Sequence, residues 1–244
     1  MAPYPWGALW AICPDPQRRY HSVLAQRYDG AHTMIGVLPS GLHPQTLEPC
    51  VSFFWSLAVS DYPTWQQRGL QDWKSQVLSH WPEIEDLVNP LQTHSDLTFA
   101  EYGDVVMQRW HDRGLVCIGD AAHGMSPQLG QGANLALIDA FVLDACIESA
   151  TDLPSAFAQY SAMRKNHIRF YQFASRRLTP LFQSNSRFAG IIRDASFPLI
   201  RKIPFLYKQA VRTVAGVKTG LLFDKPSQGV RVAVAANTRG VNTV

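Results

Sequence analysis

The chain has 244 residues, of which 46% are hydrophobic and 17% are charged, with a formal net charge of +3. This composition excludes a disordered or membrane-spanning chain and allows one or two domains with a packed core. The small charge gives no reason to expect nucleic acid as a partner. The four cysteines show no CxxC spacing and the first ten residues resemble no signal peptide, so we expect a cytoplasmic protein.

Residues 1–60 are predicted to form a sheet. Strand-like runs cover residues 7–13, 18–28, 32–38 and 50–59. Asp29-Gly30 lies between two of these runs and predicts a hairpin turn. Helical spacing follows over residues 65–79 and 83–88, and two further strands are expected at 97–102 and 105–110.

The segment from Leu115 to Ala140 is the most informative part of the chain. The apolar run Leu115–Ile118 predicts a buried strand, and the glycines and proline of residues 119–131 predict a loop. Apolar residues at helical spacing from Gly132 onward predict a helix that is buried on most sides. A strand, a glycine-rich loop and a helix N-terminus bring unpaired N–H groups to one point, which favours a negatively charged ligand.

Asp120 is the side chain that we expect to contact such a ligand. It follows Gly119 at the carboxyl end of the strand, where ligands bind in open α/β sheets. Gly130 and Gly132 allow the backbone to approach a flat or phosphorylated ligand closely. The alternative is an ordinary strand-to-helix connection with turn glycines.

Two other kinds of site are disfavoured by the spacing. His111, Asp120 and His123 include the ligand types of an iron or zinc site, but they lack a helical i, i+4 pair, so we expect no metal. No G-x-S-x-G motif follows a strand, which argues against a Ser–His–Asp hydrolase. No catalytic base can be named from the sequence. His123 could lie near a ligand, but it could equally point to solvent or cap the loop.

The C-terminal part is predicted to be helical and basic. Residues 152–183 form a long helical stretch that is interrupted near Pro180. Residues 176–218 hold nine Lys or Arg and one acid, Asp194, with apolar residues between them. This pattern fits peripheral contact with an anionic membrane or, as we favour from the sequence, a solvated helix covering the rest of the protein. Residues 224–244 are expected to be a loose tail.

The block around Asp120 resembles the second FAD fingerprint of the para-hydroxybenzoate-hydroxylase-like flavoprotein monooxygenases. The resemblance is carried by Gly119-Asp120-Ala121-Ala122-His123, Pro127, Gly130-Gln131-Gly132-Ala133-Asn134 and Asp139-Ala140. It implies that Asp120 binds the ribityl chain of FAD and that Pro127 lies beside the reactive edge of the isoalloxazine. It also implies that Gly132, Ala133 and Asn134, with Gln131 nearby, present N–H groups to the flavin pyrimidine edge. A helix N-terminus there stabilises the anionic reduced flavin.

The resemblance also implies a substrate and a reaction. In that family a sheet like the one predicted for residues 1–60 forms the floor of the substrate cavity. Trp10, Phe53 and Trp55 are therefore candidates to line an aromatic pocket, with packing in the core as the alternative. The implied activity is FAD-dependent hydroxylation of an aromatic or similar small organic substrate by NAD(P)H and O2.

Part of the family's pattern is missing. The family begins with a strand–GxGxxG–helix unit that holds the ADP half of FAD, and the only G-x-G here is Gly130–Gly132. The family's later Asp-Gly motif is followed by Ser and Arg, which Asp29-Gly30 lacks. The chain therefore resembles the C-terminal portion of a family member. The alternative function is a non-catalytic remnant, or a half-protein that binds FAD only with a partner chain supplying the N-terminal half.

The expected fold class is α/β (α+β). It is a partial FAD/NAD(P)-binding fold with an antiparallel or mixed substrate-domain sheet and a C-terminal helical region. We expect substrate-domain sheet and helices at 1–104, a partial FAD-binding unit at 105–150, C-terminal helices at 151–223 and the tail at 224–244.

Overall fold

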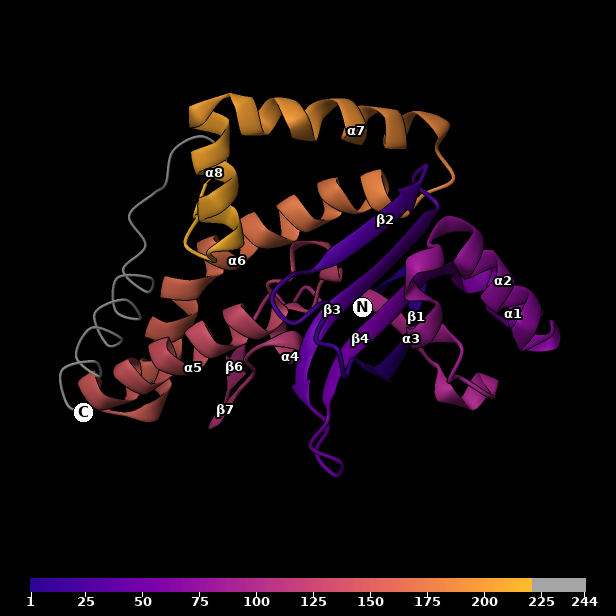
Figure 1. The fold of residues 1–244 in the computed structure, drawn as a ribbon. Helices are drawn as coiled ribbons and strands as arrows, with labels where there is room; N and C mark the ends of the chain where they lie inside the picture. Colours follow the sequence, from indigo (N-terminus) through magenta and orange to yellow (C-terminus); the bar gives the residue numbers. More distant parts are fainter. Residues whose placement is uncertain (221–244) are drawn as a thin grey trace. The chain divides into compact units, whose positions relative to one another are not determined.

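The structure is a computed structural model that describes residues 1–220 (Figure 1). The predicted tail at 224–244 lies outside these residues. The chain divides into two compact units. The sheet unit comprises Pro3–Tyr102 and Pro180–Asp194, and the helical unit comprises Met1–Ala2, Gly103–Thr179 and, of the described residues, 195–220.

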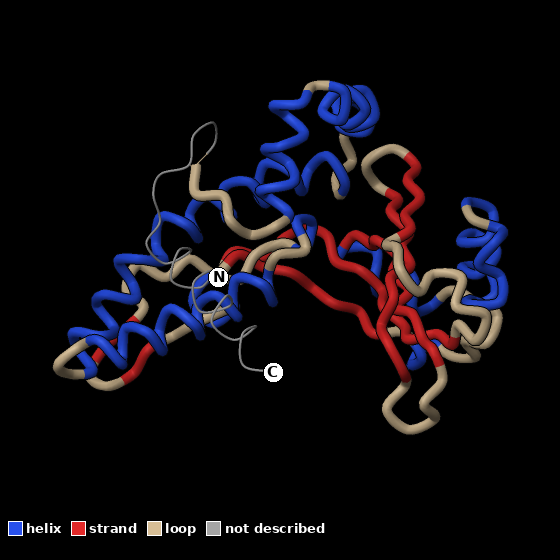
Figure 2. The backbone as a smooth tube through the Cα atoms, turned by 60° about the vertical axis from the view of Figure 1, so that its left-hand side comes forward, coloured by secondary structure: helices blue, strands red, loops and turns tan. Residues whose placement is uncertain are grey.

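The sheet unit is built on a five-stranded sheet with the strand order β2-β3-β4-β1-β5. Its strands are β1 (Ala2–Pro14), β2 (Ala25–Asp29), β3 (Thr33–Leu42), β4 (Pro49–Ala58) and β5 (Thr98–Asp104). The β1–β4, β4–β3 and β3–β2 pairs are antiparallel, and Figure 2 shows these strands in red. The predicted hairpin at Asp29-Gly30 is confirmed, and Gly30 has a φ of +57°, which favours glycine.

Short helices cover one face of this sheet. They are η1 (Val59–Asp61), α1 (Tyr62–Gln67), α2 (Leu70–His80), η2 (Pro82–Ile84), α3 (Glu85–Val88) and η3 (His94–Asp96). Leu9, Val37 and Phe53 of the strands pack with Trp73 and Leu87 of the helices in a single apolar core. The helix predicted over residues 65–79 is thus two helices, because the backbone between them, at residues 68 and 69, is extended.

The helical unit contains the segment around Asp120. Its elements are β6 (His111–Asp112), β7 (Leu115–Val116), α4 (Asp120–His123), η4 (Pro127–Leu129), α5 (Gly132–Ser149), α6 (Leu153–Phe182), α7 (Arg187–Lys202) and α8 (Pro204–Val214). Parts of α6 and α7 belong to the sheet unit. Leu135 and Val142 of α5 pack against Tyr160, Ile168 and Tyr171 of α6. None of the helices within residues 1–220 is long and apolar enough to cross a membrane.

The fold class is confirmed, with an antiparallel sheet and C-terminal helices, but several other local predictions are wrong. Of the strand expected over residues 18–28 only β2 forms, and the loop expected over residues 119–131 contains α4 and η4. Residues 105–110 form no strand, because the Val105 N–H donates to the Gly124 carbonyl and the Val105 carbonyl accepts from the Gln172 side chain. The strand over residues 115–118 shrinks to the two residues of β7. Pro180 does not interrupt α6, which continues through it to Phe182.

A further correction concerns α5, which was predicted to be buried on most sides. Leu137 is 61% exposed and Phe141 is 52% exposed, whereas Leu135 and Val142 are fully buried. The helix therefore has one face packed on α6 and one apolar face with no packing partner in the described part of the chain.

Candidate functional site

The loop after β7 begins at a glycine that no other residue can replace without strain. Gly119 has a φ of +58°, in the left-handed region. A Cβ atom on Gly119 would lie 3.1 Å from the Cβ of Ala136 on α5. The Gly119 N–H donates a 2.9 Å hydrogen bond to Oδ2 of Asp139. Backbone conformation, packing and hydrogen bonding thus all position the residue that follows, Asp120.

The Asp120 carboxylate is free to bind a ligand. Its side chain is exposed, and within residues 1–220 it makes no hydrogen bond or ion pair. Gly132, the first residue of α5, lies beside it, since a Cβ on Gly132 would be 3.7 Å from Oδ1 of Asp120. The structure therefore places the Asp120 carboxylate next to the N-terminus of α5. Because Gly132 has no side chain, a ligand can reach both groups.

The N-terminus of α5 is uncapped. Gln131 stands at the N-cap position but makes no side-chain capping hydrogen bond, and the N–H groups of Gly132, Ala133 and Asn134 have no partner among the described residues. Gly130 has a φ of +61° and open space where a Cβ would point. These N–H groups and the helix dipole create a positive potential at this point, which suits an anionic group.

The side chains of Gln131 and Asn134 do not face this opening as ligand groups. Gln131 is 5% exposed, and its Nε2 donates a 2.7 Å hydrogen bond to the Val214 carbonyl. Its Oε1 accepts a 2.9 Å hydrogen bond from Nδ2 of Asn134. Gly216 packs on Asn134 so closely that a Cβ would lie 2.0 Å from Nδ2. Both side chains hold the segment after α8, so the backbone N–H groups of α5 are what remains for a ligand.

Behind the loop lies a buried ionic cluster centred on Asp139, which is fully buried. Its Oδ2 accepts hydrogen bonds from the Gly119 N–H and from Nε2 of His123, the latter at 2.5 Å. Its Oδ1 accepts a 2.6 Å hydrogen bond from Nε of Arg164. Burial alone would raise the pKa of Asp139, but the His123 hydrogen bond and the Arg164 charge outweigh it and hold the pKa below its ordinary value.

The cluster continues from Arg164 to the C-terminal segment. Nη1 of Arg164 donates to Nδ1 of His167, whose Nε2 donates a 2.8 Å hydrogen bond to the Gly216 carbonyl. This pattern requires the neutral tautomer of His167 with its proton on Nε2. Burial and the adjacent Arg164 charge lower the pKa of His167 to about 4. One network thus connects the Gly-Asp loop, α5, α6 and the segment after α8.

Sequence reasoning missed most of this network. Asp139 was part of the fingerprint but had no role, and Arg164 and His167 were not singled out. His123 was expected to cap the loop, point to solvent or approach a ligand, whereas it is 2% exposed and bonded to Asp139. The sequence did contain one signal, since Asp139 is an acid among the apolar residues of a predicted helix. A buried carboxylate needs a cationic or hydrogen-bonding partner, so Asp139 indicated that such a partner lies nearby.

The three aromatic candidates for a substrate pocket do not share one face of the sheet. Trp10 pairs in register with Phe54, and their rings lie 4.9 Å apart on the face opposite α1 and α2. Phe53 is fully buried in the core beneath those helices, as the core alternative predicted. Trp55 faces the same way as Phe53. The three side chains therefore cannot all line one pocket on a single face, because neighbouring residues of a strand point to opposite faces, and their contact with a substrate stays a prediction.

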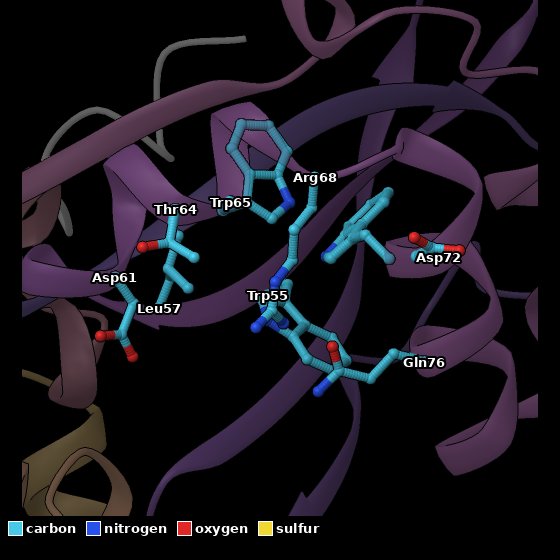
Figure 3. A pocket seen from close by; sticks show the side chains of 9 residues that line it. Trp55, Leu57, Asp61, Thr64, Trp65, Arg68, Asp72 and Gln76 are labelled. Atoms are coloured by element: carbon cyan, nitrogen blue, oxygen red, sulfur yellow. The ribbon is translucent and has the colours of Figure 1, made fainter.

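Trp55 does border a pocket within the sheet unit, which Figure 3 shows from close by. Its volume is about 350 Å³, and it is lined by Trp55, Leu57, Asp61, Thr64, Trp65, Arg68, Asp72, Trp73 and Gln76. The indole N–H groups of Trp65 and Trp73 are buried there without a partner among the described residues. In Figure 3 the Arg68 side chain runs from Trp65 towards Trp55. The pocket offers a small molecule aromatic walls and hydrogen-bond donors.

No group of three or more His, Cys, Asp or Glu side chains within residues 1–220 is arranged to hold a metal ion. Of the residues weighed as ligands, His123 bonds to Asp139, and Nδ1 of His111 lies 3.0 Å from the Ser161 hydroxyl. The histidines thus have protein partners, and the free group is the Asp120 carboxylate.

A free acid beside an uncapped helix N-terminus, at the end of a Gly-Asp loop, is an arrangement with which proteins of the α/β class bind cofactors. A family model described as an FAD binding domain matches residues 32–169, which is more than half of the chain. The chain therefore belongs to this family, the para-hydroxybenzoate-hydroxylase-like FAD-dependent monooxygenases, as the fingerprint predicted. This membership supports FAD as the cofactor.

Relatives with known names agree with this assignment. The chain is 36% identical over 90 residues to aurachin C monooxygenase/isomerase of Stigmatella aurantiaca, covering 37% of this chain and 24% of that protein. It is 45% identical over 71 residues to kynurenine 3-monooxygenase of Stenotrophomonas maltophilia, covering 29% of this chain and 16% of that protein.

A solved structure shows the same fold. HpxO of Klebsiella pneumoniae, in complex with FAD and uric acid, superposes with a TM-score of 0.64 at 15% identity. The match covers 90% of this chain and 54% of HpxO. The chain thus spans about half the length of this protein.

Proposed function

We propose that the chain forms the flavin-ring half of the FAD site of a monooxygenase. The proposed reaction is hydroxylation of an aromatic or similar small organic substrate with NAD(P)H and O2. The free Asp120 carboxylate beside the uncapped N-terminus of α5 carries this proposal. The relatives named above, both monooxygenases, support the reaction class.

The residues present fit the flavin end of FAD. Asp120 would accept hydrogen bonds from the ribityl hydroxyls, because its carboxylate is exposed and has no other partner among the described residues. The N–H groups of Gly132, Ala133 and Asn134 would donate to the pyrimidine edge, where the helix dipole favours negative charge. Pro127, exposed at the start of η4, would pack beside the ring. Bound FAD would supply the redox chemistry, namely hydride acceptance and activation of O2.

Trp10 is the side chain that we propose for contact with an aromatic substrate ring. It is half-buried on the face of the sheet opposite α1 and α2, its ring lies 4.9 Å from that of Phe54, and its Nε1 lies 3.4 Å from the Tyr102 hydroxyl. An aromatic cluster of this kind can bind a ring through offset or edge-to-face contacts.

The ADP half of FAD needs a nucleotide-binding unit with the GxGxxG motif, which residues 1–244 do not contain. We propose that such a unit packs on α5, where Leu137 and Phe141 are exposed. Exposed apolar side chains of this size on a helix mark a surface that another element covers.

The test begins with the chain expressed alone, dialysed, and examined for flavin absorbance and for binding of added FAD. A flavin band, or saturable binding of FAD, supports a working half-site. Colourless protein that takes up no FAD would instead support the non-catalytic alternative, in which FAD binding requires a partner chain.

Asp120→Ala tests the site itself. Loss of a charge-assisted hydrogen bond of roughly 1.5–3 kcal/mol should weaken FAD affinity by about 10- to 100-fold. Asp144→Ala is the matched control, because Asp144 is an exposed acid on α5 and should leave affinity unchanged. Equal FAD affinity in Asp120→Ala and wild type would remove Asp120 from the site.

A further inference from the structure

α7 turns its apolar stripe away from the protein. Phe188 is 75% exposed, Ile191 65%, Ile192 56% and Leu199 54%. Their spacing of three, four and seven residues places all four on one side of the helix. A solvated surface helix shows the reverse arrangement, with its apolar side inward and its charges in water.

The inward side of α7 explains this orientation. Arg193 is 3% exposed, its Nη1 donates a 2.9 Å hydrogen bond to the Gly30 carbonyl, and its guanidinium lies 4.3 Å from the centre of the Tyr28 ring. Gly190 packs against the same turn, where a Cβ would lie 2.8 Å from the Gly30 carbonyl carbon. Rotating α7 to bury its stripe would break all of these contacts, so the stripe stays outside.

α8 repeats this feature independently. None of its residues is buried. Tyr207 is 53% exposed, Val211 48% and Val214 66%, and their spacing of four and three residues places them on one side of the helix. Two consecutive helices therefore each present an apolar stripe with no packing partner among the described residues.

The charges beside these stripes have one sign. Arg187, Arg201, Lys202 and Lys208 are exposed, and Asp194 is the single acid between residues 187 and 214. Asp194 is paired with Arg193, at 2.8 Å, and Arg187, Arg201, Lys202 and Lys208 have no ion-pair partner within residues 1–220. An apolar stripe flanked by Lys and Arg is complementary to a surface of anionic headgroups over acyl chains.

We propose that α7 and α8 bind the surface of an anionic phospholipid bilayer. Phe188, Ile191, Ile192 and Leu199 enter the boundary between headgroups and acyl chains, and the neighbouring Arg and Lys side chains contact lipid phosphates. A second copy of this chain is a poorer occupant, because stripe-to-stripe packing would bring the same basic side chains together. The binding is peripheral.

The test measures co-sedimentation of the whole chain with vesicles of phosphatidylcholine alone and of phosphatidylcholine with 30% phosphatidylserine. We expect binding to the anionic vesicles that weakens as salt rises, and little binding to the neutral ones. Ile191→Gln/Ile192→Gln should weaken binding by about 10-fold or more, because two apolar side chains no longer enter the membrane. Arg187→Gln/Lys202→Gln should weaken binding to the anionic vesicles alone, by about 10-fold or more.

Val23→Gln/Leu24→Gln is the matched control, since these two apolar residues are 53% and 56% exposed and belong to neither α7 nor α8. This variant should bind vesicles like wild type. The proposal is overturned if wild type binds neither vesicle, or if Ile191→Gln/Ile192→Gln binds as wild type does. It is also overturned if light scattering shows a wild-type dimer that this variant converts to a monomer, which would assign the stripe to a second copy.

Discussion

Replacing Asp139 by Asn tests the buried network that supports the Gly-Asp loop. The carboxylate accepts three hydrogen bonds, from Gly119, His123 and Arg164, and both it and Arg164 are fully buried. The substitution keeps the shape of the side chain but leaves the Arg164 charge buried without its counter-ion. Breaking a buried ion pair on one side costs about 3–5 kcal/mol, so we expect a loss of this size in the free energy of unfolding.

The assay is urea unfolding followed by circular dichroism, with hydrogen exchange at the Gly119 amide as the local measure. For a chain of this length the loss corresponds to a fall in Tm of roughly 6–20 °C. The Gly119 amide should exchange faster in the variant, because its N–H loses the carboxylate acceptor. Asp144→Asn, an exposed acid on the same helix, should change the free energy of unfolding by less than about 0.5 kcal/mol.

A loss below about 1 kcal/mol, together with unchanged exchange at Gly119, would refute this reasoning. It would mean that the Arg164 guanidinium is satisfied without the carboxylate, through the Leu135 carbonyl and His167. The loop would then be held by its own backbone conformation and not by the network behind it.

Two further outcomes follow from the same geometry. His167 is neutral in the folded state with a pKa of about 4, against 6.5 in the unfolded chain, so its contribution to stability is complete above pH 6.5 and is lost as pH falls towards 4. The loss is about 3 kcal/mol over this window, and urea unfolding of His167→Gln should show a flatter dependence on pH. Gly119→Ala should destabilise the loop by about 1–3 kcal/mol and weaken FAD binding, because Ala disfavours a positive φ and meets the Ala136 Cβ; equal Tm and equal FAD affinity would contradict this.

The sheet could be predicted because its signals are local. Alternation of apolar residues around Phe53 and the Asp29-Gly30 turn each lie within a few residues, and both appear in the structure. The strand expected at residues 105–110 failed for a non-local reason. The backbone of Val105 forms hydrogen bonds with Gly124 and Gln172, which lie 19 and 67 residues away in sequence. No pattern within residues 105–110 predicts those partners.

The residues at which helices begin and end were harder to predict than the presence of the helices. One helix expected over residues 65–79 became α1 and α2, because extended backbone at Gly69 separates them. The helix after the fingerprint begins at Gly132 as predicted, but its exposed Leu137 and Phe141 show that apolar residues on both sides do not guarantee burial. Burial depends on which other elements are present to pack against a helix.

By itself the sequence determined the Gly-Asp loop, the start of α5 and the position of Asp120, since glycine conformation and helix termini are set by neighbouring residues. Only the tertiary structure decided that Asp139 and His123 pair with Arg164, because side chains on separate helices meet through packing. The tertiary structure also decided which way α7 faces. Contacts of Arg193 and Gly190 with the Gly30 turn direct the apolar stripe outward, and a helical pattern alone cannot distinguish an inward face from an outward one.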